Sequence, residues 1–252
     1  MSDITVAAAA DMLLAVREGR SPRIAGLGAA APRTEAEAWA IQREVLRRLG
    51  GRIGGYKCAT PLGKPASAAL LDAAGLRAAP VQWPVPPGAR IGIETEIAFR
   101  IGRDLPARGT PYGREEVLDA VAACFPAVEL VESRYLDPAA VSPLEAMADS
   151  IAHAGLVCGA EVPDWRARDL AALTVRQSCG GGVQVEKAGG NPSGDPVTPL
   201  VWLANHLPSL GLHLQAGQVV TTGSCTGLTW VEGGQRVVGE FLGFGQAVVD
   251  LV

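Results

Sequence analysis

The clearest pattern of hydrophobic and polar positions in this chain is an alternation between residues 91 and 101. Isoleucine and phenylalanine dominate one parity, while the other carries glycine, alanine, arginine and two glutamates, Glu94 and Glu96. A period of two in a segment rich in β-branched residues predicts a β-strand. Residues two apart on a strand point to the same face, about 7 Å apart. The two carboxylates are therefore expected to share one face of this strand.

A second predicted strand, at residues 127–134, also contains carboxylates. Glu129 shares its parity with Ala127 and Val131, whereas Glu132 lies on the opposite face. Glutamate is a poor strand former, so its presence in a strand is commonly explained by solvent exposure and sometimes by a metal. Two carboxylates on one face repel each other unless a proton or a hard cation such as Mg²⁺ lies between them. From the pattern alone, both a solvated face and a cation site stay open.

Helical patterns are concentrated in the first fifty residues. A helix is predicted at 3–18 and another at 34–49, where Thr34 and Glu37 form a capping box and Gly50 and Gly51 supply the stop. Two further helices are predicted at 114–125 and 198–209, with shorter helical segments at 66–74 and within 139–152. The remaining strands are predicted at 52–59, 155–160, 173–176, 183–187, 218–222, 227–231, 235–241 and 247–251. A helical beginning followed by a strand-rich remainder indicates an α+β fold.

Lys57 lies inside the otherwise mostly apolar strand predicted at 52–59. Such a lysine often keeps its aliphatic stem on the protein and its ammonium in water. The alternative is a buried ammonium, which requires counter-charges that converge on it. The segment after it, residues 61–88, is rich in proline, glycine and alanine, which suits a loop or lid beside a site.

Composition narrows the classes of function. The net charge of −4, without a basic cluster, argues against nucleic acid or an anionic membrane as a partner. No apolar run reaches the roughly 18 residues of a membrane span, and the first residues lack the basic segment of a signal peptide. The five cysteines are scattered without a C-x-x-C motif, so neither zinc nor a disulfide framework is indicated. We expect a single cytoplasmic domain over residues 1–252.

Several motifs follow one another in a defined order along the chain. Gly55-Tyr56-Lys57 precedes Ile93-Glu94-Thr95-Glu96-Ile97-Ala98, and Pro126-Ala127-Val128-Glu129 comes next. The series continues with the segments at 199–204 and 217–223 and a glycine-containing ending at 239–245. In this order, over nearly the whole chain, the motifs resemble the fumarylacetoacetate hydrolase superfamily and, within it, the 2-keto-4-pentenoate hydratase branch.

The resemblance implies a fold and a site. The fold would be a rolled mixed β-sheet around a pseudo-barrel, with residues 1–85 as a helical section and lid and residues 86–252 as a strand-rich metal-binding core. The site would hold Mg²⁺ or Mn²⁺ on Glu94, Glu96 and Glu129. Lys57 would be catalytic and would bind substrate, together with the loop at Thr222 and Gly223. Glu132 has no ligand counterpart, so the solvated interpretation stands for it.

The resemblance also implies an activity: a lyase that adds water to a 2-hydroxy-2,4-dienoate or 2-oxo acid to give a 4-hydroxy-2-oxo acid, in aromatic-compound catabolism. A 2-oxo acid decarboxylase, a C–C hydrolase and a non-catalytic partner subunit are the alternatives. A homo-oligomer is expected, with a complex with a related subunit as a further option.

Two departures from the pattern of the related hydratases leave the proton-transfer groups open. The passage from Cys58 to Gly92 is shorter, so Asp72 is only the nearest candidate for an acid at the rim. His153 and the two residues after it stand where an Asp–Asn pair is expected after Asp149. The sequence therefore leaves the roles of Asp72, Asp149 and His153 open.

Overall fold

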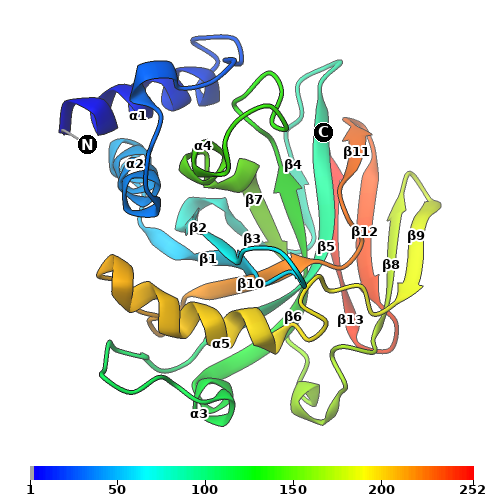
Figure 1. Cartoon of the computed structure of the whole chain (residues 1–252). Coiled ribbons are helices and arrows are strands. Elements are labelled where there is room, and N and C mark those ends of the chain that lie inside the picture. The colour runs from blue at the N-terminus through cyan, green and yellow to red at the C-terminus, as the bar shows by residue number, and fades with distance from the viewer. Residues whose placement is uncertain (1–2) are drawn as a thin grey trace.

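Two β-sheets, flanked by helices on one side, make up the chain in this computed structural model, which describes residues 3–252 (Figure 1). Met1 and Ser2, the first residues of the segment that lacks the basic residues of a signal peptide, lie outside the described residues. Within the described part, none of the helices combines the length and the hydropathy that crossing a membrane requires. The cytoplasmic location stays a prediction.

The two N-terminal helices form as the sequence predicts. The Thr34 hydroxyl accepts a hydrogen bond from the Glu37 N–H at 3.3 Å, and the Glu37 carboxylate accepts one from the Arg33 N–H at 2.6 Å. These contacts satisfy backbone donors that a helix start leaves without partners. The α-helices of the described residues are α1 (Asp3–Arg17), α2 (Glu35–Arg48), α3 (Arg114–Asp119), α4 (Pro143–Ala148) and α5 (Val197–His206).

The first sheet has the order β2-β1-β10-β5-β6-β7-β3, and β11 pairs with a further part of β5. Its pairs are antiparallel except β1 with β10 and β3 with β7. A Cβ atom at Gly55 would lie 1.8 Å from the Val219 carbonyl oxygen, so only glycine permits the close approach of β1 and β10. The strands are β1 (Ile53–Ala59), β2 (Ser67–Asp72), β3 (Leu76–Ala78), β5 (Arg90–Ile101), β6 (Val121–Val131), β7 (His153–Cys158), β10 (Val219–Ser224) and β11 (Thr229–Glu232).

The second sheet packs against one face of β5 and β6. Ile93 and Leu130 from the first sheet form a buried core with Val237 and Val249 from the second. Because side chains alternate along a strand, Glu94 and Glu96 are directed to the opposite face. The strand order is β4 (Val81–Trp83), β13 (Gly245–Leu251), β12 (Arg236–Phe241), β8 (Thr174–Cys179) and β9 (Gly182–Ala188).

Two helix predictions are wrong. Residues 66–74 contain β2. Residues 68–71 of this strand are buried, and packing there overrides the helix propensity of the alanines. The helix predicted at 114–125 ends at Asp119, and β6 already begins at Val121, so Pro126 lies inside β6. The segment 61–88, predicted as a loop or lid, holds β2, β3 and β4, so the α-helices of the N-terminal section end at Arg48.

Candidate metal centre

Three carboxylates meet on the face of β5 and β6 that points away from the second sheet. Glu94 lies directly opposite Glu129 in the antiparallel register, and Glu96 follows two residues later on the same face. One ligand atom from each residue lies within 4.8 Å of the others. Glu96 and Glu129 are 2% and 0% exposed, respectively. The structure thus brings together the three residues predicted as metal ligands.

The protein satisfies one oxygen of each buried carboxylate. Glu96 Oε2 accepts hydrogen bonds from the Thr221 hydroxyl and, at 3.0 Å, from the Gly223 N–H. Glu129 Oε1 accepts one from Lys57 Nζ at 2.5 Å and contacts His153 Nδ1 at 2.9 Å.

Glu129 Oε2 is buried and has no hydrogen-bond partner among the described residues. A buried carboxylate oxygen without a partner is costly, and a hard cation would satisfy it. The three residues therefore fit a divalent ion.

The electrostatics of the cluster also favour a cation. Burial, together with the neighbouring Glu129 carboxylate, raises the pKa of Glu94, and the same causes with Glu94 raise the pKa of Glu96 to about 8. Burial also acts to raise the pKa of Glu129, but the Lys57 ammonium and the His153 hydrogen bond outweigh it and lower that pKa. Three carboxylates face one ammonium, so a divalent cation would offset the excess negative charge.

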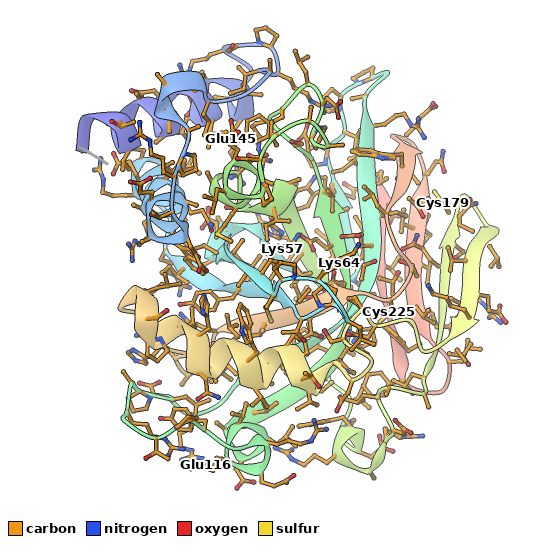
Figure 2. The ribbon with its side chains drawn as sticks, in the orientation of Figure 1. Lys57, Lys64, Glu116, Glu145, Cys179 and Cys225 are labelled. Carbon is orange, nitrogen blue, oxygen red and sulfur yellow. The ribbon has the colours of Figure 1, made fainter. Side chains whose placement is uncertain are left out.

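Lys57 is a buried ammonium rather than a surface lysine. Its side chain is 13% exposed and donates to Glu129 Oε1 and, at 3.2 Å, to the Ile151 carbonyl oxygen. Burial acts to lower the Lys57 pKa, but the carboxylates of Glu129, Glu94 and Glu96 raise it above its ordinary value. Figure 2 shows Lys57 in the middle of the molecule, between the helices and the sheets. The counter-charges that a buried lysine requires are present.

A left-handed turn delivers the Ile151 carbonyl to Lys57. Ser150, Ile151 and Ala152 have φ values of 50°, 50° and 59°. Each residue other than glycine in this region costs about 1–2 kcal/mol, so the surroundings must hold the turn in place.

Arg134 holds both ends of the turn. It donates to the Asp149 carboxylate, to the Asp149 carbonyl at 2.7 Å and to the His153 carbonyl at 3.2 Å. The structure therefore gives Asp149 a partner that the sequence did not predict, because no motif contains Arg134.

We predict that Arg134→Met destabilises the protein by about 3–5 kcal/mol, because it leaves the Asp149 carboxylate buried without its counter-ion. Urea unfolding followed by circular dichroism measures this difference. Arg168→Met is the matched control, since its pair with Asp164 is 41% and 55% exposed and should contribute less than about 1 kcal/mol. Equal unfolding free energies for the two variants would show that Arg134 does not hold the turn at 150–152 in place.

A cavity of about 260 Å³ adjoins two of the three carboxylates, Glu94 and Glu96. Two serines that the sequence did not single out, Ser67 and Ser224, bring hydroxyl groups to it; they belong to no motif and come from different strands. The cavity is lined by Lys57, Cys58, Ala59, Ser67, Glu94, Glu96, Ile151, Pro192, Gly223 and Ser224.

The structure places the two residues of the predicted substrate-binding loop differently with respect to the cavity. Gly223 lines the cavity, but its N–H already donates to Glu96. Thr222 is fully buried and donates to the Ile97 carbonyl at 2.9 Å, away from the cavity lining. Alternation along β10 explains the difference, because Thr221 and Gly223 share the face that meets Glu96.

Asp72 and His153 lie outside the cavity lining. The Asp72 carboxylate accepts a hydrogen bond from the Ala74 N–H at 3.0 Å and so stabilises the turn after β2. This contact does not support a role for Asp72 as an acid at the rim of the cavity. The His153 imidazole is 3% exposed and lies behind Glu129, which its Nδ1 contacts. Burial lowers the pKa of His153.

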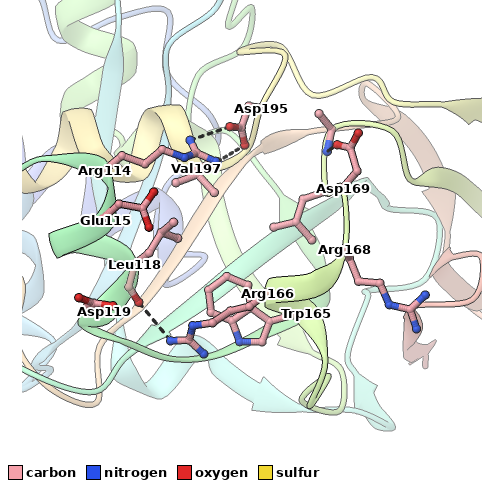
Figure 3. A pocket seen from close by; sticks show the side chains of 12 residues that line it. Arg114, Glu115, Leu118, Asp119, Trp165, Arg166, Arg168, Asp169, Asp195 and Val197 are labelled. Carbon is pink, nitrogen blue, oxygen red and sulfur yellow. Dashed lines mark hydrogen bonds and ion pairs between the residues drawn. The ribbon is translucent and has the colours of Figure 1, made fainter.

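Neither the cavity thiol nor a second cavity offers an alternative site. Burial raises the pKa of the Cys58 thiol well above its ordinary value, so it would not serve as a nucleophile. Figure 3 shows a second cavity, of about 280 Å³, between α3 and residues 165–171. There Arg114 pairs with Asp195 at 2.7 Å and Arg166 donates to the Leu118 carbonyl at 3.1 Å. These two arginines are thus already engaged by the protein.

The family model described as fumarylacetoacetate (FAA) hydrolase C-terminal matches residues 60–252. A 2-hydroxyhexa-2,4-dienoate hydratase of Comamonas testosteroni is 33% identical over 57% of this chain and 53% of its own length. A 4-oxalocrotonate decarboxylase of Pseudomonas putida is 29% identical over 64% of this chain and 60% of its own length. The matches thus span little more than half of each relative.

A solved structure shows the same fold along the whole chain. It is a 4-oxalocrotonate decarboxylase from Pseudomonas putida G7 complexed with magnesium and adipate. The likeness has a TM-score of 0.88 at 22% identity and covers 100% of this chain and 99% of the other. The predicted fold class, including the N-terminal helical section, is confirmed by this likeness.

Proposed function

The chain belongs to the fumarylacetoacetate hydrolase family, and we propose that it is a metal-dependent hydratase. In this proposal it adds water to a small 2-hydroxy-2,4-dienoate and releases a 4-hydroxy-2-oxo acid. The name of the Comamonas testosteroni relative supports this class of reaction. The observation that carries the proposal is the unpartnered, buried Glu129 Oε2 beside Glu94 and Glu96, at a cavity that also exposes Lys57.

Glu94, Glu96 and Glu129 would hold Mg²⁺ or Mn²⁺ in this proposal. The name of the solved magnesium complex supports an ion of this type. When bound, the ion supplies Lewis acidity that polarises a 2-oxo or 2-hydroxy oxygen and stabilises negative charge there. Carboxylates are the oxygen ligands that these hard ions prefer.

The chain's own residues would bind and orient the substrate. Lys57 Nζ would lie beside the substrate carboxylate and offset its repulsion by the three glutamates. The Ser67 hydroxyl can donate a hydrogen bond from the cavity wall, whereas the Ser224 hydroxyl is hydrogen-bonded to Glu94. Ala59, Ile151 and Pro192 offer apolar surface for the carbon chain, and a volume of about 260 Å³ suits a small acid.

A decarboxylase is the second candidate, supported by the sequence match to the Pseudomonas putida enzyme. Both reactions build negative charge on the same oxygen, so the same charges would serve both. A C–C hydrolase is less well supported, because no histidine lines the cavity among the described residues and His153 lies behind Glu129. A non-catalytic partner subunit would keep the metal but turn over no substrate.

Turnover of a panel of 2-hydroxydienoates and 2-oxo diacids, with Mg²⁺ and with EDTA, tests the proposal. We expect a 4-hydroxy-2-oxo acid from a dienoate with Mg²⁺ and at least a 10²-fold slower rate in EDTA. Release of CO₂ from a diacid would favour the decarboxylase instead. Metal binding without turnover of any panel member would favour the partner subunit.

We also propose that the chain forms a homo-oligomer. The support is the resemblance to the family, together with exposed apolar side chains on the surface. Leu228, just before β11, is 46% exposed, and Trp230, within β11, is 38% exposed. Leu136 is 66% exposed. Sedimentation equilibrium at micromolar concentration should give at least twice the chain mass of 26.0 kDa. A mass equal to that of one chain would refute the proposal.

A further inference from the structure

His153 has no role in the proposed reaction, yet its imidazole is buried against a proposed metal ligand. It is the first residue of β7, the neighbour of β6, and lies opposite Val131 in the register. Its side chain is 3% exposed, and its one hydrogen-bond partner among the described residues is Glu129, through Nδ1. Its Nε2 atom is buried and has no partner in the same part of the chain. The imidazole therefore makes its one polar side-chain contact with Glu129.

Two donors meet on the same oxygen of Glu129. Lys57 Nζ, from β1, and His153 Nδ1, from β7, both contact Oε1, whereas Oε2 has no hydrogen-bond partner among the described residues. An ionised carboxylate only accepts hydrogen bonds, so Nδ1 carries the proton in this contact. Two fixed donors on one oxygen oppose rotation of the carboxylate. They leave Oε2 as the oxygen available to an ion.

The position of His153 is itself fixed by the backbone. The left-handed turn at 150–152 ends at His153, and Arg134 donates to the His153 carbonyl at 3.2 Å. The imidazole thus starts from an anchored backbone and ends on Glu129. Because His153 does not line the cavity, it would reach substrate only through Glu129.

We propose that His153 is a positioning residue of the metal centre, which holds Glu129 by Oε1 so that Oε2 is presented to the divalent ion. The inference rests on the metal centre proposed above. Donors to the non-coordinating side of a metal ligand typically change metal affinity by 10- to 100-fold. His153 therefore tightens ion binding without contacting ion or substrate.

Titration with Mn²⁺ alone, followed by electron paramagnetic resonance of the free ion, tests this role in the full chain. We expect His153→Phe, which keeps a ring but has no hydrogen-bond donor, to raise the Kd for Mn²⁺ by 10- to 100-fold. His153→Asn, whose amide N–H can take the place of Nδ1–H, should stay within about threefold of the original chain. His206→Phe is the matched control. His206 pairs with Glu35 at 2.7 Å and stacks on Trp202, and its substitution should leave the Kd unchanged.

Thermal melting in EDTA separates this role from a general loss of stability. His153→Ala is the second variant in case the phenylalanine does not fit, and it should weaken Mn²⁺ binding as much. A folded His153→Phe or His153→Ala variant with a Kd within twofold of the original chain overturns the inference and leaves the metal centre intact. Absence of Mn²⁺ binding in the original chain overturns both.

Discussion

Replacing both Glu94 and Glu129 by glutamine is expected to weaken divalent-cation binding by at least 10²-fold and to abolish turnover. The two side chains face each other across β5 and β6, and with Glu96 they supply the three carboxylates of the cluster. Glutamine keeps the shape of each side chain but removes two of the three negative charges. Hard cations such as Mg²⁺ are bound mainly through such charged oxygens. Titration with Mn²⁺ measures the loss.

Glu132→Gln is the control for this double variant. Glu132 follows β6 directly but is exposed and pairs with Arg23 at 3.4 Å, so its substitution should leave Mn²⁺ affinity unchanged. Thermal melting supplies an independent readout. An ion at 100 times its Kd stabilises the folded chain by about 2.7 kcal/mol, so Tm should rise with Mn²⁺ only while the cluster is intact. Unchanged affinity in the double variant would rule out the assigned ligands.

The local part of this site could be predicted from the sequence, because a strand has a period of two. The alternation at 91–101 predicts that Glu94 and Glu96 share one face, and the structure shows them on one face of β5. The pairing of Glu94 with Glu129 depends on the register between two strands separated by α3. Nothing in either strand alone sets that register, so Glu129 joined the cluster only through the family resemblance.

The two wrong helix predictions have a common physical cause, which is burial. Helix propensity describes a chain in water, whereas residues 68–71 are buried in the edge strand β2, where packing overrides that propensity. The same holds for residues 121–125, an apolar run that the sequence pattern predicts as the end of a helix but that belongs to β6.

The sequence does not predict the role of Arg134, because its partners Asp149 and His153 are 15 and 19 residues away and share no motif with it. Thr222 was placed in the site by the resemblance, although the alternation of β10 turns it away.

Lys57→Met is expected to lower kcat/KM by about 10²-fold or more while Mn²⁺ binding persists. Methionine retains most of the aliphatic stem but removes the ammonium that contacts Glu129 Oε1. Two unit charges 4 Å apart attract by about 4 kcal/mol at an effective dielectric constant of 20. A 10²-fold loss corresponds to about 2.7 kcal/mol, which lies within that limit. The effect should appear mainly in kcat, because negative charge grows as the reaction proceeds.

Lys64→Met is the matched control for this variant. Lys64 is exposed, in the loop between β1 and β2, and Figure 2 labels both lysines. Lys64 does not line the cavity, so its substitution should change kcat/KM by less than about twofold. Metal binding should survive in Lys57→Met because all three carboxylates remain, His153 still donates to Glu129 Oε1, and the variant also removes an ammonium that repels the cation. If Lys57→Met keeps kcat/KM within about twofold of the original chain on the best substrate, Lys57 serves only to neutralise the cluster, and the catalytic role assigned to it is wrong.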